Sequence, residues 1–271
     1  MRHDSHGPIG VFDSGIGGLT VLKTLMAHLP QESTLYLGDT ARVPYGTKSS
    51  EVVTKYSLKN AQFLQARGIK LLVVACNTAS AAALPALAAT LPIPVVGVIE
   101  PGARAALART SGGGVGVIGT PGTIRSGAYQ RALEAGGRAV RVKARACPLF
   151  VPLVEEGWTT GDVPMLVARE YLSEFARDGV DTLVLGCTHY PLLKGVIAEV
   201  VGPQVTLVDS AEATAQAVVE LLAAKDLMAP AGGPPPSHHF FVTDVPEVFA
   251  DVGARFLGRP IPSAELVDLS F

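Results

Sequence analysis

Short apolar runs alternate along this chain with longer segments in which apolar residues recur every three or four positions. The short runs predict buried strands, and the longer segments, rich in Ala and Leu, predict amphipathic helices. The predicted strands are 9–13, 34–38, 70–75, 94–98, 115–119, 139–143, 181–186 and 205–208, and the predicted helices are 19–28, 50–66, 103–109, 125–136, 163–178 and 211–225. This alternation indicates βαβ units, so we predict an α/β fold with mostly parallel sheets.

The pattern is interrupted near the carboxyl end of the chain. Residues 228–236 contain four prolines and two glycines, a composition that predicts a surface loop. After this loop, residues 238–243 fit one more strand and residues 245–257 fit a closing helix.

Two pairs of segments nearly repeat one another. The run that ends in Cys76 is matched by the run that ends in Cys187, and residues 9–15 are echoed by residues 115–121. The repeats predict two similar halves, each contributing one cysteine to a shared cleft at the carboxyl ends of buried strands. We place the first lobe, with Cys76, at residues 1–98 plus 209–271, and the second lobe, with Cys187, at residues 99–208.

Composition narrows the function. The chain has 271 residues, 48% of them hydrophobic, and a net charge of −2 with no basic block, which argues against a nucleic-acid partner and favours a small substrate. No apolar stretch reaches membrane-spanning length, so no membrane association is predicted. Three cysteines and an amino-terminal segment unlike a signal peptide predict reduced thiols in the cytoplasm.

The surroundings of Cys76 and Cys187 favour reactive thiols over buried apolar side chains. Asn77 and Thr78 are suited to cap a helix after Cys76, and Pro191 suits the first turn of a helix after Cys187. A helix N-terminus stabilises a thiolate and lowers the thiol pKa from about 8.5 toward roughly 7. Cys147, which precedes Pro148 and has no counterpart in the repeat, is interpreted as structural.

Polar residues near the predicted strand ends complete the candidate site. The glycine-rich turn from Asp13 to Gly18 lacks both the dinucleotide and the P-loop fingerprints, and suits the approach of backbone amides to a small anion such as a carboxylate. Asp13 either caps the following helix or lies level with Cys76, where it would bind an ammonium group or tune the thiol. The histidines show no metal-ligand spacing with the cysteines, so no metal is predicted.

Two facing thiols suit the inversion of a carbon centre. Inversion at Cα removes a proton from one face and delivers a proton to the other, which a thiolate and a thiol on opposite sides can do in place. Donors around the substrate carboxylate would stabilise the charge of the intermediate. Asn77, Thr78, Thr188, Ser14 and Thr120 lie at predicted strand ends where such donors are needed.

Several motifs resemble those of bacterial glutamate racemases, in the same order from about residue 9 to about residue 225. The matching segments are Val11 to Leu19, Gly38 to Thr40 with Pro44 to Gly46, Ala75 to Ala79, Pro152 to Glu155 and Leu185 to Pro191. The resemblance implies two three-layer lobes related by a pseudo-twofold axis, with the substrate between them. It further implies interconversion of L- and D-glutamate without a cofactor, for peptidoglycan synthesis, by an enzyme that often forms homodimers.

The resemblance also implies residue roles. Cys76 would act on the D-enantiomer, assisted by Asp13, and Cys187 would act on the L-enantiomer, assisted by Glu155 and His189. The residues implied to contact substrate are Asp13, Ser14, Tyr45, Gly46, Asn77, Thr78, Thr120, Thr188 and His189.

Three alternatives stay open from the sequence. An aspartate or hydantoin racemase would share the two-cysteine architecture and differ in the side-chain pocket. A thiol redox or Cys/His hydrolytic enzyme would use Cys187 with His189 but leave the repeated Cys76 unexplained. A non-catalytic amino-acid-binding protein would keep the glycine turn without needing two activated thiols.

Overall fold

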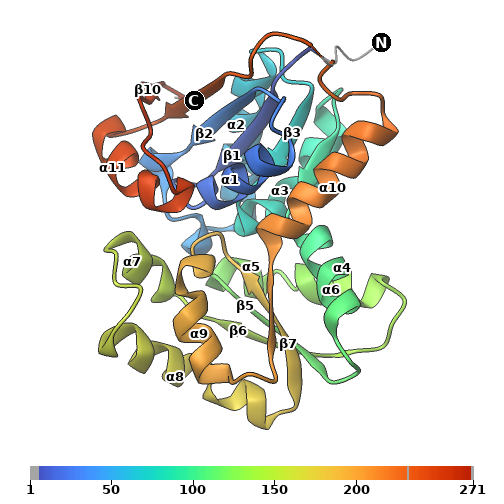
Figure 1. Cartoon of the computed structure of the whole chain (residues 1–271), viewed down its shortest axis with the longest axis vertical. Coiled ribbons are helices and arrows are strands. Elements are labelled where there is room, and N and C mark those ends of the chain that lie inside the picture. The colour runs from blue at the N-terminus through green and yellow to red at the C-terminus, as the bar shows by residue number, and fades with distance from the viewer. Residues whose placement is uncertain (1–5, 231, 270–271) are drawn as a thin grey trace.

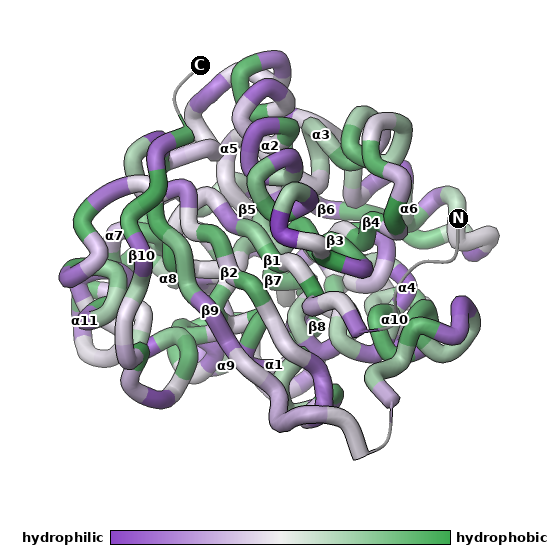
Figure 2. Tube along the Cα trace, turned by 90° about the horizontal axis from the view of Figure 1, so that it is seen from above, coloured by the Kyte–Doolittle hydropathy of each residue, from purple (hydrophilic) through white to green (hydrophobic). Residues whose placement is uncertain are grey.

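The computed structural model describes residues 6–230 and 232–269 and contains two parallel sheets, one above the other in Figure 1. The six-stranded sheet has the order β10-β9-β2-β1-β3-β4, formed by β1 (Ile9–Asp13), β2 (Thr34–Gly38), β3 (Leu71–Val74), β4 (Val95–Gly97), β9 (His238–Val242) and β10 (Glu265–Leu266). The four-stranded sheet has the order β6-β5-β7-β8, formed by β5 (Gly114–Gly119), β6 (Arg141–Ala146), β7 (Val180–Gly186) and β8 (Thr206–Asp209). We call the six-stranded sheet with the helices packed on it the first lobe, and the four-stranded sheet with its helices the second lobe. Figure 2 shows the first sheet lying over the second.

One strand order occurs twice. The series β2-β1-β3-β4 places the second, first, third and fourth strands of the first half side by side, and β6-β5-β7-β8 does the same for the second half. Cys76 and Cys187 each follow the third strand of their half. The predicted α/β class with two similar parallel sheets is therefore confirmed. The limits 1–98 plus 209–271 and 99–208 stay a prediction, with the first and last strands both in the first lobe.

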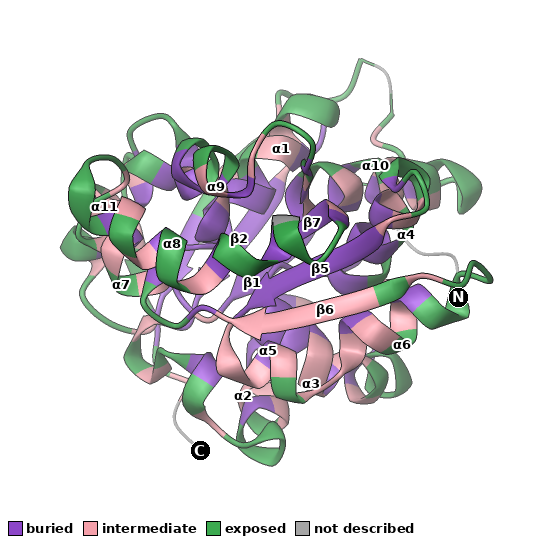
Figure 3. Cartoon of the chain, turned by 90° about the horizontal axis from the view of Figure 1, so that it is seen from below, coloured by how far each residue is buried: buried purple, intermediate pink, exposed green. Residues whose placement is uncertain are grey.

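Helices cover both faces of each sheet. On the first sheet, α1 (Leu19–His28), α10 (Ser210–Ala224) and α11 (Pro246–Leu257) pack on one face, and α2 (Ser50–Gln65) and α3 (Asn77–Thr90) pack on the other. On the second sheet, α8 (Asp162–Arg177) and α9 (Lys194–Val201) oppose α4 (Ile99–Arg109) and α6 (Ala128–Ala135). Strand β3 shows why its sequence is continuously apolar, because Leu71 and Val73 enter one core and Leu72 and Val74 enter the other. Figure 3 shows the central strands of the second sheet buried and its edge strand β6 only half-buried.

The structure differs from the predicted elements at a few places. The helix predicted at 125–136 is two helices, α5 (Pro121–Arg125) and α6, because Gly127 between them adopts a left-handed conformation with φ 64°. A short helix, α7 (Phe150–Glu155), and the two-residue strand β10 lie where no helix or strand was predicted. The described residues of the 228–236 segment form the expected loop. Within residues 6–230 and 232–269, no helix combines the length and apolar character needed to cross a membrane.

Candidate active site

A cavity of about 40 Å³ lies between the lobes, at the carboxyl ends of the parallel strands. Its walls are formed by Ser14, Val43, Pro44, Tyr45, Gly46, Cys76, Asn77, Thr78, Thr120, Val151, Cys187, Thr188 and His189. Both repeated cysteines thus face one cavity. A second, larger groove of about 780 Å³ is lined in part by α4 and α10. No cysteine or histidine lines this groove, so we place the candidate site in the smaller cavity.

The Cys76 thiol caps helix α3. Its sulfur accepts a hydrogen bond from the Ala79 amide at 3.4 Å and donates one to Ser14 Oγ at 3.7 Å. Cys76 itself therefore provides the cap, in place of the predicted Asn77 and Thr78. The expected lowering of its pKa is wrong for this structure. Burial and the nearby charge of Asp13 raise the pKa of Cys76 to about 12, against the opposing hydrogen bonds from Ala79 and Ser14.

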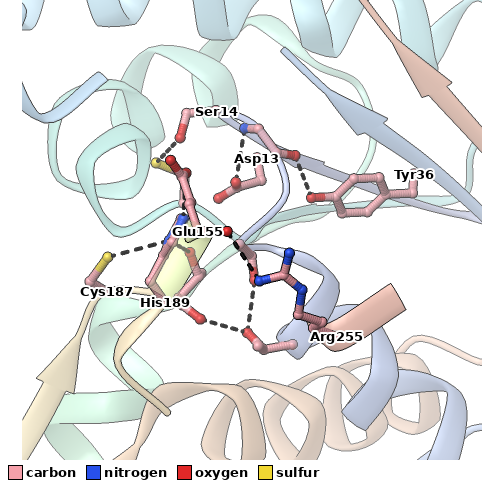
Figure 4. Close-up of polar contacts among 12 residues, drawn as sticks. Asp13, Ser14, Tyr36, Glu155, Cys187, His189 and Arg255 are labelled. Atoms are coloured by element: carbon pink, nitrogen blue, oxygen red, sulfur yellow. Dashed lines mark hydrogen bonds and ion pairs between the residues drawn. The ribbon is translucent and has the colours of Figure 1, made fainter. Parts of the chain in front are cut away.

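The Cys187 thiol lies beside a histidine that is paired with a carboxylate. Its sulfur is 3.8 Å from His189 Nδ1, and His189 Nε2 is 2.9 Å from Glu155 Oε1 (Figure 4). Burial disfavours the imidazolium, but the hydrogen bonds to Cys187 and Glu155 outweigh it and raise the pKa of His189 to about 10. A 3₁₀ turn (Tyr190–Leu193) follows Cys187, and helix α9 begins only afterwards. The sequence analysis expected the N-terminus of an α-helix to supply positive potential at Cys187. The structure instead places the charged His189 side chain beside this sulfur.

Two further residues hydrogen-bond to the backbone around the cavity, and the sequence analysis did not identify either. Arg255 Nη1 of α11 donates to the Glu155 carbonyl at 3.2 Å, and Tyr36 Oη donates to the Gly15 carbonyl at 2.9 Å in the neighbouring turn (Figure 4). Both come from positions far from the cysteines in sequence, and no local pattern marks them.

Asp13 lies buried at the end of β1, behind the cavity wall. Its Oδ2 accepts a hydrogen bond from the Gly15 amide at 2.9 Å, and within the described part of the chain its Oδ1 has no hydrogen-bond partner. Burial raises the pKa of Asp13, while the charge of His189 and backbone amides of the glycine turn oppose that rise. Asp13 therefore sits within electrostatic reach of both Cys76 and His189.

Threonine hydroxyls meet where the two lobes touch. Thr78 Oγ1 of the first lobe lies 2.8 Å from Thr120 Oγ1 and 3.2 Å from Thr123 Oγ1 of the second. Thr120 also caps α5 by accepting from the Thr123 amide at 3.2 Å. Gly46 permits this approach, because an added Cβ would lie 2.7 Å from Thr120 Cβ. Thr123 was not among the predicted site residues, and its only sequence signal is its place one turn after Thr120.

The Tyr45 phenol is engaged by two buried side chains of the first lobe. It donates to Asp39 Oδ2 and accepts from Asn60 Nδ2 at 3.1 Å, inside the core of the first lobe. Asp39 belongs to the segment that matched the racemase motifs, but the sequence analysis assigned no role to it.

A second contact between the lobes joins the glycine turn to the segment after β7. Thr20 Oγ1 donates to the Thr188 carbonyl at 3.1 Å, and Thr188 Oγ1 lies 3.5 Å from His189 Nδ1. At Gly17, an added Cβ would lie 2.2 Å from Thr188 Oγ1 and 2.5 Å from His189 Nδ1. Glycine is therefore required at this position for the lobes to meet as they do.

The structure brings the predicted site residues together. Ten of them line the cavity, namely Ser14, Tyr45, Gly46, Cys76, Asn77, Thr78, Thr120, Cys187, Thr188 and His189. Asp13 lies behind the wall, and Glu155 reaches it through His189. Among the residues that the structure describes, no group of three or more His, Cys, Asp or Glu side chains could hold a metal ion.

Known proteins share this architecture. A family model described as Asp/Glu/Hydantoin racemase matches residues 19–218. A glutamate racemase from Geobacter metallireducens is 62% identical over 261 residues, which are 96% of each chain. The crystal structure of glutamate racemase isoform RacE1 from Bacillus anthracis superimposes with a TM-score of 0.91 at 42% identity, covering 98% of both chains. The crystal structure of glutamate racemase from Francisella tularensis in complex with D-glutamate also superimposes with a TM-score of 0.91. The two chains are 40% identical, and the match covers 98% of this chain and 99% of the other.

The fold and the matches define the class of protein. The chain belongs to the Asp/Glu/hydantoin racemase family, and it is an amino-acid racemase, an isomerase.

Proposed function

We propose that this enzyme interconverts L- and D-glutamate without a cofactor, using Cys76 and Cys187 as acid and base on opposite faces of Cα. The observation that carries the proposal is that both sulfurs face one small cavity between the lobes. Glutamate is favoured as the substrate because relatives with 62% and 52% identity are glutamate racemases. A solved aspartate racemase homologue from Pyrococcus horikoshii is only 20% identical, which is a likeness of fold alone.

The environments of the two thiols suit opposite protonation states. His189 beside Cys187 stays protonated at neutral pH, because its pKa is raised to about 10, and it places a positive charge next to that sulfur. Cys76, whose pKa burial and Asp13 raise to about 12, stays a thiol at neutral pH. The closed site is therefore prepared for an L-substrate. The Cys187 thiolate takes the Cα proton, the electron pair moves into the α-carboxylate as an enediolate, and the Cys76 thiol returns a proton to the other face. The reverse sequence converts the D-enantiomer.

The residues around the cavity support this chemistry. Asn77, Thr78, Thr120 and Thr188 supply hydrogen-bond donors near the strand ends, where the charge of the enediolate would be stabilised. Asp13 is placed to assist Cys76 when that sulfur has to lose its proton. Glu155 holds His189 in orientation and stabilises its positive charge.

Substrate entry requires the lobes to separate. A cavity of about 40 Å³ holds about three water molecules, which is less than a glutamate with its five carbons and two carboxylates. We therefore propose that this structure is a closed state and that the cleft opens to admit the substrate and closes on binding.

The wider role follows from the product. We propose that the enzyme works in the cytoplasm as a homodimer and supplies D-glutamate for peptidoglycan. Sedimentation analysis of the purified protein tests the dimer, and D-glutamate auxotrophy after deletion of the gene tests the biosynthetic role.

One experiment tests the reaction. Purified protein, free of pyridoxal phosphate and metal, is incubated with L-glutamate in deuterated water, and we expect D-glutamate that carries deuterium at Cα. Cys76→Ala and Cys187→Ala should each abolish racemisation, while Cys147→Ala, which changes a buried thiol outside the cavity, should leave it nearly intact. Full activity after loss of one cavity cysteine would refute the two-base scheme, and activity on aspartate alone would assign a different substrate.

A further inference from the structure

One end of the Asn77 side-chain amide has no hydrogen-bond partner in the part of the chain that the structure describes. Asn77 is 2% exposed and lines the cavity directly after Cys76, and its Nδ2 is buried without a hydrogen-bond partner among the described residues. A buried N–H group left unsatisfied is destabilising, because the hydrogen bonds it made to water are lost and not replaced. Buried polar groups in native proteins nearly always have partners, so an orphan in the wall of a binding cavity points to a partner on the ligand.

The other end of the same amide is held firmly. Asn77 Oδ1 accepts a hydrogen bond of 2.7 Å from the phenol of Tyr129, which is 1% exposed. Burial keeps the pKa of Tyr129 well above its ordinary value, so the phenol retains the proton that it donates. The Ser210 side chain opposes this rise in the pKa of Tyr129, but burial outweighs it.

Close packing holds the Tyr129 ring in position. An added Cβ on Gly186 would lie 3.0 Å from Tyr129 Cε2, and one on Gly102 would lie 3.3 Å from its hydroxyl. The ring therefore fills a slot that only small residues leave open, and the hydroxyl has little freedom to leave Asn77.

The hydrogen bond also joins the two lobes. Asn77 is the first residue of α3 in the first lobe, whereas Tyr129 lies in α6 of the second lobe. Separation of the lobes would break this bond and release the amide, and closure would restore it. The orientation of Asn77 is thereby coupled to closure of the cleft.

We propose that Tyr129 is a positioning residue, which on lobe closure holds Asn77 Oδ1 and so presents Asn77 Nδ2 to the α-carboxylate of the substrate. The inference rests on the proposed racemisation of glutamate. The α-carboxylate is the group that gains negative charge when Cα loses its proton, and an amide next to Cys76 lies beside the sulfur that faces Cα. A preoriented donor stabilises that charge more than a freely rotating one.

The test is a pair of tyrosine variants assayed for glutamate racemisation. Tyr129→Phe keeps the ring and removes the hydroxyl, and we expect kcat to fall about 10-fold with KM changed less than about threefold, since the amide acts mainly on the intermediate. Tyr190→Phe is the matched control, because it removes an equally buried phenol that donates to the Cys147 carbonyl at 2.8 Å in the same lobe. The control should lose comparable thermal stability and keep its kcat per folded molecule.

A double-mutant cycle separates positioning from a general structural effect. In an Asn77→Ala background, Tyr129→Phe should change kcat less than about twofold, because its target is gone. An equal loss of kcat in both backgrounds, or an unchanged kcat in Tyr129→Phe alone, would overturn the proposal.

An NMR measurement, which does not depend on activity, separates the positioning role of Tyr129 from the proposed racemisation of glutamate. The side-chain amide signals of Asn77, assigned by their loss in Asn77→Ala, should shift in the NMR spectrum of Tyr129→Phe and stay in place in Tyr190→Phe. A shifted amide in a protein that does not racemise glutamate would overturn the proposed function, and the substrate role of Tyr129 with it. Racemisation that is insensitive to Tyr129→Phe would overturn the role of Tyr129 alone.

Discussion

The His189 imidazole lies 2.9 Å from the Glu155 carboxylate, and this contact makes the surroundings of the two cavity thiols electrostatically unequal. Glu155, the last residue of α7, supports a positive charge on His189 next to Cys187. Cys76 instead has the Asp13 carboxylate nearby. The two halves repeat one topology, but their thiols have neighbours of opposite charge.

Removal of the charged neighbour of Cys187 should slow the reaction. We expect His189→Gln to lower kcat/KM about 100-fold, which is typical for loss of a group that assists proton transfer. Because the equilibrium constant between enantiomers is one, kcat/KM must fall equally in both directions. Initial rates with L- and D-glutamate, followed by circular dichroism, measure this effect. His28→Gln, which changes a histidine 2.8 Å from Glu212 outside the cavity, should leave the rates unchanged, and undiminished rates in His189→Gln would contradict the assignment.

The same histidine makes stability depend on pH. The pKa of His189 rises from its ordinary value of 6.5 to about 10, so its contribution to stability is fully present below pH 6.5 and is lost as pH rises toward 10. The pKa of Cys76 is raised from 9.0 to about 12, so the free energy of unfolding falls further as pH rises from 9 to 12. Urea unfolding across this pH range should show a falling free energy of unfolding. In His189→Gln the decline between pH 6.5 and 10 should flatten, and an unchanged slope would count against a charged His189.

The contact at Gly17 predicts a strong effect of one methyl group. Gly17→Ala would place Cβ 2.2 Å from Thr188 Oγ1, so the lobes would be forced apart at the site and His189 displaced. We expect at least a 100-fold loss of kcat/KM, because small misplacements of catalytic groups cost that much. Gly15→Ala is the control in the same turn, since its Cβ would meet only Val43 Cγ2 at 3.6 Å. Similar activities of the two variants would disprove the steric argument.

A buried ion pair far from the cavity predicts a stability effect. Lys70 Nζ lies 2.6 Å from Glu32 Oε2, with side-chain exposures of 1% and 2%. Lys70→Met would leave a buried carboxylate unpaired and cost about 3–5 kcal/mol of unfolding free energy. Adding Glu32→Gln should recover part of this loss, because Gln removes the charge and still accepts from the Ala229 amide.

An exposed ion pair serves as the comparison. Arg104 and Glu220 are 65% and 54% exposed and lie 3.6 Å apart, so Arg104→Met should change stability by less than about 1 kcal/mol. Chemical denaturation of the variants measures both effects. Equal losses of unfolding free energy in Lys70→Met and Arg104→Met would show that burial does not determine how much an ion pair contributes to stability.

Local sequence was sufficient for the strands and for the position of the thiols. The eight predicted strands are present. The central strands β1, β3, β5 and β7 were marked most clearly, because residues buried on both faces of a parallel sheet are nearly all apolar. The glycine turn after Asp13 and the cysteines after β3 and β7 were predicted for the same reason, since the end of an apolar run marks the end of a strand. The repeat also predicted that both cysteines would face one cleft.

Tertiary structure decided the chemical character of the site. The pKa of Cys76 is raised because burial and Asp13 outweigh the amides at the start of α3, a balance that helix position alone does not reveal. The Tyr45–Asp39 and Tyr129–Asn77 hydrogen bonds join residues from separate elements, and no periodicity encodes them. A sequence pattern reports which side chains leave water, whereas the charges and hydrogen bonds around a buried group depend on the neighbours that folding brings to it.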